Sequence, residues 1–578
     1  RPNGPTVHRI VGPLGRYSDR PAPVPQGGAL GWANRRAFGP KTPWQEFLPH
    51  PSRLAWLSLR GWTWYTGRHG VDGLHPLPAV RLPVEAYPMN VAGEQHRTIL
   101  QNIARRVMLE RGLLPDFSVE ALTELGKIQA PAAIGDGQSH DLRQLLWASI
   151  DNDDSRDLDQ LTVAAAMPGD KVKILVAVAD VDSVVKNSSA IDEHARHNTT
   201  SVYTAAAIFS MLPEKLSTDI TSLGLHEDRL AIVVEMIVGG DGSVQDSSLY
   251  RACVQNQAKL AYDSVAAWLE GGKTPAPVAA VPGLDENLRL QDRVAQGMKN
   301  LRQVHGALSF ESLETRPIFD GDEIQELKVE KTNRAKDLIA DFMIAANGVT
   351  ARYLSARKFP SLRRVVRTPK RWDRIVELAQ QHGFSLPDEP DPRPLEEFLL
   401  KQQAADPLRF PDLSLSVIKL MGPGEYVADC PGDASPPGHF GLAVRDYTHS
   451  TAPNRRYSDI ITQRLLKAAL AAQPAPYNND DLQALAKHCT EEEDAAKKVE
   501  RQVGKSAAAM LLESRIGEQF DAIVTGAADK GTWVRLLNPP VEGRLVHWFE
   551  GLDVGQRARV RLIRTDVEQG FIDFERVG

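Results

Sequence analysis

The chain has 578 residues, of which 42% are hydrophobic and 25% charged, as expected for a globular protein of several domains. It contains no run of 18 apolar residues and begins at Arg1-Pro2 without a signal-peptide pattern, so we expect no membrane span and a cytoplasmic location. The net charge of −6 argues against a uniformly basic nucleic-acid binder, although a locally basic channel remains compatible with it.

Residues 1–130 are interpreted as an accessory domain. Pro, Gly and Trp are abundant in residues 1–88, and residues 57–65 alternate like a short strand. Residues 94–111 have a helical apolar stripe that ends at Gly112, and a second short helix is expected after Ser118. Two short helices and a β-ribbon are compatible with a helix-turn-helix or winged-helix domain.

Residues 131–512 mix strand and helix patterns and predict an α+β domain. Apolar strands are expected from Lys173 to Val181 and from Leu230 to Val238, and a long helix over 334–357. Pro-rich loops are expected at 386–394 and 431–437. Cys253, Cys430 and Cys489 lie far apart and predict neither a zinc site nor a disulfide framework.

Residues 513–578 predict a small β-barrel of the OB type. Five short strand patterns are separated by Gly and Pro turns. Within 557–563, Arg557, Arg559 and Arg561 alternate with apolar residues, which places the three guanidiniums on one face of a strand. This face is either simply solvated or a track for an RNA backbone.

Residues 151–159 form the most concentrated acidic run, with five carboxylates between two apolar segments. A solvated loop is one interpretation of the run. An EF-hand calcium loop is not, because Arg156 stands where its glycine is needed and Thr162 where its glutamate is needed. If the segment is extended, Asp157 and Asp159 point to the same side. Asp151 then completes the set from across the loop. This arrangement favours a site for Mg²⁺, with Mn²⁺ as the alternative ion.

Several ordered motifs resemble those of the ribonuclease II/ribonuclease R family, which has an RNB-type catalytic domain. The resemblance covers roughly residues 115–578, including the C-terminal barrel, which resembles an S1-type RNA-binding domain. The matching segments are Ser149–Gln160, Val176–Val181, Thr200–Tyr203, Met211–Ser217, Asp228–Ala231, Met343–Asn347, His439–Leu442 and Ser450–Asp459. So many motifs in one order are far more specific than a single short motif.

The resemblance implies a processive 3′→5′ exoribonuclease that hydrolyses single-stranded RNA to nucleoside 5′-monophosphates with divalent metal ions, and it favours a monomer. It implies metal ligation by Asp151, Asp157, Asp159 and position 160, and catalytic roles for Asp159, Arg455 and Glu500. The RNA-binding residues that it implies, or that the residue patterns suggest, are Tyr203, Tyr262, Phe310, Arg456, Arg557, Arg559 and Arg561.

Gln160 departs from the family pattern, which has a second consecutive Asp at this position. An amide oxygen can still bind Mg²⁺ but contributes no negative charge. The alternative hypothesis is therefore a catalytically impaired, RNA-binding or regulatory relative. The departure in residues 1–110, where the family typically has cold-shock-type domains, also predicts a different accessory domain.

Overall fold

The computed structural model describes residues 96–133, 139–311, 313–432, 436–528, 531–552 and 554–577, all within one compact unit. The predicted strand at 57–65 and most of the predicted accessory domain lie outside these residues. The helix-turn-helix hypothesis and the boundary at residue 130 therefore stay predictions. Among the described helices, none is long and apolar enough to cross a membrane.

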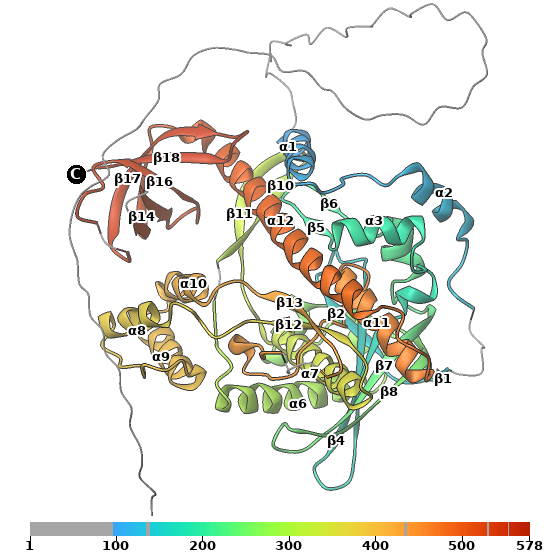
Figure 1. The fold of residues 1–578 in the computed structure, drawn as a ribbon. Coiled ribbons are helices and arrows are strands. Elements are labelled where there is room, and N and C mark those ends of the chain that lie inside the picture. The colour runs from blue at the N-terminus through green and yellow to red at the C-terminus, as the bar shows by residue number, and fades with distance from the viewer. Residues whose placement is uncertain are drawn as a thin grey trace, which may run out of the picture. The chain divides into compact units, whose positions relative to one another are not determined.

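A seven-stranded mixed sheet carries the main apolar cluster and lies at the lower right of Figure 1. Neighbouring strands are antiparallel except for the parallel pairs β1–β8 and β2–β9. The spatial order is β1 (His140–Asp141), β8 (Val244–Gln255), β7 (Asp228–Val238), β4 (Val172–Ala179), β3 (Gln160–Ala166), β2 (Ala148–Asp151) and β9 (Ala258–Ala261). The predicted strands of this region correspond to β4 and β7.

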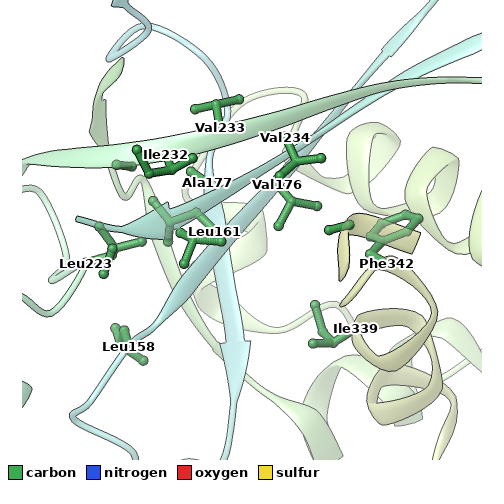
Figure 2. Packing of buried hydrophobic residues seen from close by; sticks show 14 of the residues in the cluster. Leu158, Leu161, Val176, Ala177, Leu223, Ile232, Val233, Val234, Ile339 and Phe342 are labelled. Atoms are coloured by element: carbon green, nitrogen blue, oxygen red, sulfur yellow. The ribbon is translucent and has the colours of Figure 1, made fainter. Parts of the chain in front are cut away.

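The sequence of β4 explains its central place. Its apolar, partly β-branched residues from Ile174 to Ala179 are all buried, which suits a strand that has a neighbour on each edge and packed layers on its faces. The long helix α7 (Arg334–Ala356) confirms the predicted helix and packs against this sheet, with Phe342 fully buried among the strand side chains (Figure 2). The helix α6 (Leu284–Val304) is joined to β3 by a hydrogen bond from Thr162 to Gln291.

The remaining elements of residues 131–512 surround this core. They are α3 (Ala190–Asn198), the strand pair β5 (Val202–Tyr203) and β6 (Ile208–Phe209), the π-helical turn Leu216–Ile220, α4 (Tyr262–Leu269), α5 (Ala276–Ala279), β10 (Glu314–Asp320), β11 (Glu323–Glu330), β12 (Ser361–Val365), α8 (Trp372–Gln381), α9 (Pro392–Ala405), α10 (Phe410–Met421), β13 (Glu425–Asp429), α11 (Tyr457–Leu470) and α12 (Asn479–Leu512). The helices α8, α9 and α10 have a small core of their own.

Two N-terminal helices confirm the predicted ones. The helix α1 (His96–Glu110) buries Leu100, Ile103 and Val107 in one apolar cluster with residues of α12. The helix α2 (Val119–Lys127) begins at the predicted Ser118, whose hydroxyl accepts a hydrogen bond from the Ala121 N–H. Both helices therefore pack onto the body of the described unit.

The C-terminal region is a closed five-stranded barrel, which confirms the predicted OB-type architecture and the α+β class. Its strands are β14 (Gln519–Ala528), β15 (Gly531–Leu536), β16 (Glu542–His547), β17 (Arg557–Asp566) and β18 (Phe571–Arg576). Ala508, Ala509 and Leu512 at the end of α12 lie in the barrel core, so this long helix joins the barrel to the sheet region (Figure 1). A two-contact ion pair between Arg535 of β15 and Asp412 of α10 adds a second connection.

Replacing Phe342 with Ala should lower the free energy of unfolding by about 3–5 kcal/mol, because it removes a fully buried aromatic ring and leaves a cavity. Chemical denaturation measures the change. Phe571→Ala is the matched control, since Phe571 is 59% exposed and its loss should cost less than about 0.5 kcal/mol. Equal effects of the two substitutions would contradict the assignment of the core.

Candidate active site

The acidic loop is anchored in the core by a single leucine between two of its aspartates. Leu158 is 4% exposed and lies in the main apolar cluster with Leu161 and Leu223 (Figure 2). Its N–H donates to Ser222 Oγ at 3.0 Å, and its carbonyl accepts the Leu223 N–H at 2.9 Å. The loop cannot move freely as a solvated loop would, since these bonds and the buried side chain hold it.

The predicted extended segment through Asp157 is not a strand. The strand β3 begins only at Gln160, because Leu158 turns inward and its backbone groups bond to residues 222 and 223. Asp159 is nearly fully buried, whereas Asp157 is half-buried and Asp153 and Asp154 are exposed. The predicted placement of Asp157 on the same side as Asp159 stays a prediction.

Asp159 receives its contacts from a turn almost 300 residues later. Its Oδ1 accepts the Asn454 N–H at 2.9 Å, and its Oδ2 lies 3.3 Å from Arg455 Nε. The Oδ2 atom is buried and has no hydrogen-bond partner in the described structure. Burial raises the pKa of Asp159 to about 7, and it outweighs the opposing effects of Arg455 and the Asn454 N–H.

Asp151 and Gln160 belong to the site from the neighbouring strands β2 and β3. Asp151 ends β2, is 8% exposed, and has a pKa raised mainly by burial, with the charge of Arg455 opposing the shift. It pairs in register with Ala261, so Tyr262 follows beside it at the start of α4. Burial and then the charge of Asp151 raise the pKa of Tyr262. Gln160 is buried at the first position of β3, opposite Val178.

The residues have the donor chemistry that a hard divalent cation requires. Asp151, Asp157 and Asp159 supply carboxylate oxygens, Gln160 supplies an amide oxygen, and Asp159 Oδ2 accepts no hydrogen bond from the described residues beside its ion pair with Arg455. The charge of Asp157 also raises the pKa of both Asp151 and Asp159, so the three groups lie within electrostatic reach. Within the described ranges, however, no three His, Cys, Asp or Glu side chains are already arranged to hold a metal.

Tyr203 and Glu500 lie together beside this acidic group. The Tyr203 N–H donates to Glu500 Oε1 at 2.8 Å, and its hydroxyl donates to Asp157 Oδ2 at 3.3 Å. Burial raises the pKa of Glu500. A cavity of about 290 Å³ opens here, lined by Thr199, Thr200, Ser201, Tyr203, Tyr426, Arg455, Arg456, Ser458, Cys489, Glu493, Ala496, Lys497 and Glu500. Arg455, Tyr203 and Glu500 therefore line one opening, and the buried Asp159 lies behind Arg455 through their ion pair.

Other predicted residues lie elsewhere or have protein partners. Phe310 is half-buried and packs against the α8–α10 core. The guanidinium of Arg456 makes two hydrogen bonds to Asp459, although Arg456 also lines the cavity. In β17 the predicted alternation is present, but Arg559 pairs with Asp521 and Arg561 with Glu575. Arg557 is exposed on the same strand. Roles of these residues in RNA binding stay predictions.

Two residues of the site were missed in the sequence. Asn454 donates its backbone N–H to Asp159. Nearly every residue type has a backbone N–H, so the identity of residue 454 could not indicate this contact. Asp459 is fully buried and holds Arg456. Its position three residues after Arg456, at the start of a helix, is the one signal that could have suggested an ion pair.

The pH dependence of stability tests the buried state of Asp159. Because its folded pKa of about 7 lies above the ordinary value of 3.8, protonation favours the folded state, and stability falls as pH rises between these values. In EDTA, Asp159→Asn removes this loss. We define the Tm difference as the Tm of Asp159→Asn minus the Tm of the wild type. This difference should be several degrees larger at pH 8, where the wild-type carboxylate is ionised, than at pH 5.

Asp153→Asn, an exposed change in the same loop, should show little difference at either pH. A difference between Asp159→Asn and the wild type that is the same at both pH values would contradict a buried carboxylate with a raised pKa.

Comparison with known proteins identifies two domains in the chain. The profile of the RNB domain matches residues 139–472, and that of the RNase II-type exonuclease C-terminal S1 domain matches residues 518–577. Ribonuclease R of Vibrio cholerae is 29% identical over 476 residues, which are 76% of this chain and 57% of that protein. The chain spans little more than half the length of the curated relatives that head the comparison.

Solved structures share the fold. RNase R of Mycoplasma genitalium, in complex with ribose-methylated single-stranded RNA, has a TM-score of 0.75 at 21% identity, covering 83% of this chain and 78% of that one. Yeast Ssd1, described as a pseudonuclease, has a TM-score of 0.62 at 15% identity, covering 77% and 55%. Because the RNB match spans more than half of its residues, the chain belongs to the RNB-domain family and carries a ribonuclease II-type S1 domain.

Proposed function

We propose that this chain is a 3′→5′ exoribonuclease that degrades single-stranded RNA processively to nucleoside 5′-monophosphates. The observation that carries the proposal is the meeting of Asp159 and Arg455 beside a cavity that also contains Tyr203 and Glu500. A carboxylate for metal and water chemistry, a guanidinium for phosphate charge and an aromatic ring for a base are what such a reaction requires. The RNB relatives named ribonuclease R give the same expectation.

The acidic residues would hold Mg²⁺, or Mn²⁺, at the reacting phosphate. Asp151, Asp157 and the Gln160 amide oxygen would be its ligands, together with Asp159 Oδ2, which accepts no hydrogen bond within the described part of the chain beside its ion pair with Arg455. When bound, the metal supplies an activated water and stabilises the leaving 3′-oxygen. Arg455 is held at 3.3 Å from Asp159, where its guanidinium can bind the phosphate oxygens as their charge grows in the transition state.

The aromatic and hydroxyl groups suit RNA without requiring a particular sequence. Tyr203 is 39% exposed at the cavity and can stack on a base of any type. Tyr262, next to Asp151, has a hydroxyl suited to the ribose 2′-OH, which separates RNA from DNA. The exposed Arg557 of the barrel adds positive charge for the upstream backbone.

An alternative function is RNA binding without efficient hydrolysis. Two observations favour it: Gln160 is neutral, and a protein described as a pseudonuclease shares the fold. The two functions differ in whether RNA is shortened when Mg²⁺ is added.

Uniformly labelled single-stranded RNA, incubated with Mg²⁺ or with EDTA, tests the proposal. We expect release of nucleoside 5′-monophosphates with Mg²⁺ alone, shortening of a 5′-labelled copy from its far end, and no digestion of a DNA of the same sequence. Binding of the RNA without shortening under either condition would favour the alternative, and digestion of the DNA would exclude specificity for RNA.

Asp159→Asn should reduce mononucleotide release by at least about 100-fold, because it removes the charge that the metal and water chemistry needs. Affinity for RNA in EDTA should change little, since Arg455 and Tyr203 remain. Asp153→Asn, an exposed change in the same loop, is the control and should keep normal turnover. Normal turnover of Asp159→Asn would refute the assignment of this site.

Gln160→Asp should lower the Mg²⁺ concentration for half-maximal activity by about tenfold, equivalent to about 1.4 kcal/mol of added attraction. Gln160→Asn is the matched control, because it shortens the side chain to the same length without adding charge. An unchanged Mg²⁺ requirement of the Asp variant would show that position 160 is not at the metal. If the wild-type chain is inactive and Gln160→Asp restores mononucleotide release, the result would instead support the alternative function.

A further inference from the structure

The two consecutive arginines of the site have different surroundings. Arg455 faces Asp159, whereas Arg456 Nε and Nη2 donate to Asp459 at 2.8 and 2.7 Å. Asp459 is fully buried in the first turn of α11. Asp459 and Arg456 therefore form a rigid pair, because both hydrogen bonds must break before either side chain can rotate.

The same carboxylate also holds the turn that precedes the helix. Asp459 Oδ1 accepts the Ala452 N–H at 2.8 Å, and Oδ2 accepts the Ser458 hydroxyl at 3.1 Å. Arg455 is only three residues after Ala452, and the N–H groups of Arg455 and Arg456 return to the Ala452 carbonyl at 3.2 and 3.0 Å. Movement of Ala452 would therefore move Arg455.

The turn is connected to both other parts of the site. On one side, the Asn454 N–H donates to Asp159. On the other, the Arg455 carbonyl accepts the Ser201 N–H at 3.0 Å, two residues before Tyr203. A single turn thus fixes the positions of the acidic loop, the Arg455 guanidinium and the Tyr203 segment.

We propose that Asp459 and Arg456 are positioning residues for hydrolysis, which fix the 452–456 turn so that Arg455 and Asp159 meet the scissile phosphate in a productive arrangement. The inference rests on the proposed exoribonuclease function. It assigns Arg456 to the support of the site, although this residue lines the cavity and its side chain is 28% exposed. Displacement of a catalytic group by about 1 Å can cost about 100-fold in rate.

A double-mutant cycle tests the inference, with kcat for mononucleotide release measured in Mg²⁺ and RNA affinity measured in EDTA. Asp459→Asn keeps the size of the side chain and weakens its pairing with Arg456. We expect kcat to fall by about 10- to 100-fold with less than about a threefold change in RNA affinity. In an Arg455→Lys background, the same substitution should lower kcat by less than about threefold further, because it acts through Arg455.

Arg456→Lys is the second variant, which keeps the charge beside Asp459 but loses the two-contact geometry, and it should behave in the same way. Asp292→Asn is the matched control: Asp292 of α6 is buried and accepts two hydrogen bonds from Arg334 of α7, at 2.8 and 2.7 Å, away from the 452–456 turn. Its loss should lower Tm, and any effect on kcat should be unchanged by Arg455→Lys.

The inference would be overturned if kcat of the double variant fell by the product of the two single-variant reductions, which would show that Asp459→Asn and Arg455→Lys act independently. Equal losses of kcat and of RNA affinity would also overturn it. If Asp459→Asn does not fold, the Arg456→Lys cycle decides by the same criteria. Failure of the wild-type chain to release mononucleotides would instead refute the proposed function and the inference with it, so the two failures are distinguishable.

Discussion

The contact between a buried carboxylate and a distant turn determines the organisation of this RNB-domain chain. Asp159 would be costly to bury in ionised form without partners, and burial raises its pKa to about 7 even with the opposing charge of Arg455. Its partners, the Asn454 N–H and the Arg455 guanidinium, lie almost 300 residues later in the chain. The sheet and α11 must therefore be assembled before Asp159 has its surroundings, so the site exists only in the complete fold.

The fold meets this requirement by anchoring both sides of the contact. Leu158 inserts into the apolar core between Asp157 and Asp159, which gives a loop of like charges a fixed backbone. On the other side, Asp459 holds the start of the turn. Between them, Asp159 Oδ2 accepts no hydrogen bond from the described chain and has only its ion pair with Arg455, which is a local cost in stability at a position where the proposed reaction needs an oxygen ligand.

Much of the framework was predictable because it depends on local patterns. The apolar run of β4, the amphipathic helix α1, the Ser118 cap and the alternating strands of the barrel are all present. The positions of Asp159, Arg455, Tyr203 and Glu500 in one site followed from resemblance of ordered motifs, since periodicity cannot show which distant residues meet. The structure brings these four together.

The remainder could not be predicted from residue type. Asp157 and Asp159 lie before β3, which begins at Gln160, so the strand pattern does not settle their orientation and their predicted common side stays a prediction. The sequence alone does not distinguish Arg456 from Arg455. In the structure, Arg456 makes two hydrogen bonds to Asp459, whereas Arg455 faces Asp159. The backbone donor at Asn454 carries no side-chain signal, and the ion pairs of Arg559 and Arg561 depend on strand register.

A structure of the Asp159→Asn protein with Mg²⁺ and a single-stranded RNA would test the central claim most directly. The account predicts the 3′-terminal phosphodiester between residue 159 and Arg455, with the metal on Asp151 or Asp157 and a terminal base against Tyr203. An RNA 3′ end bound only at the barrel, or a terminal phosphate that does not contact Arg455, would contradict it.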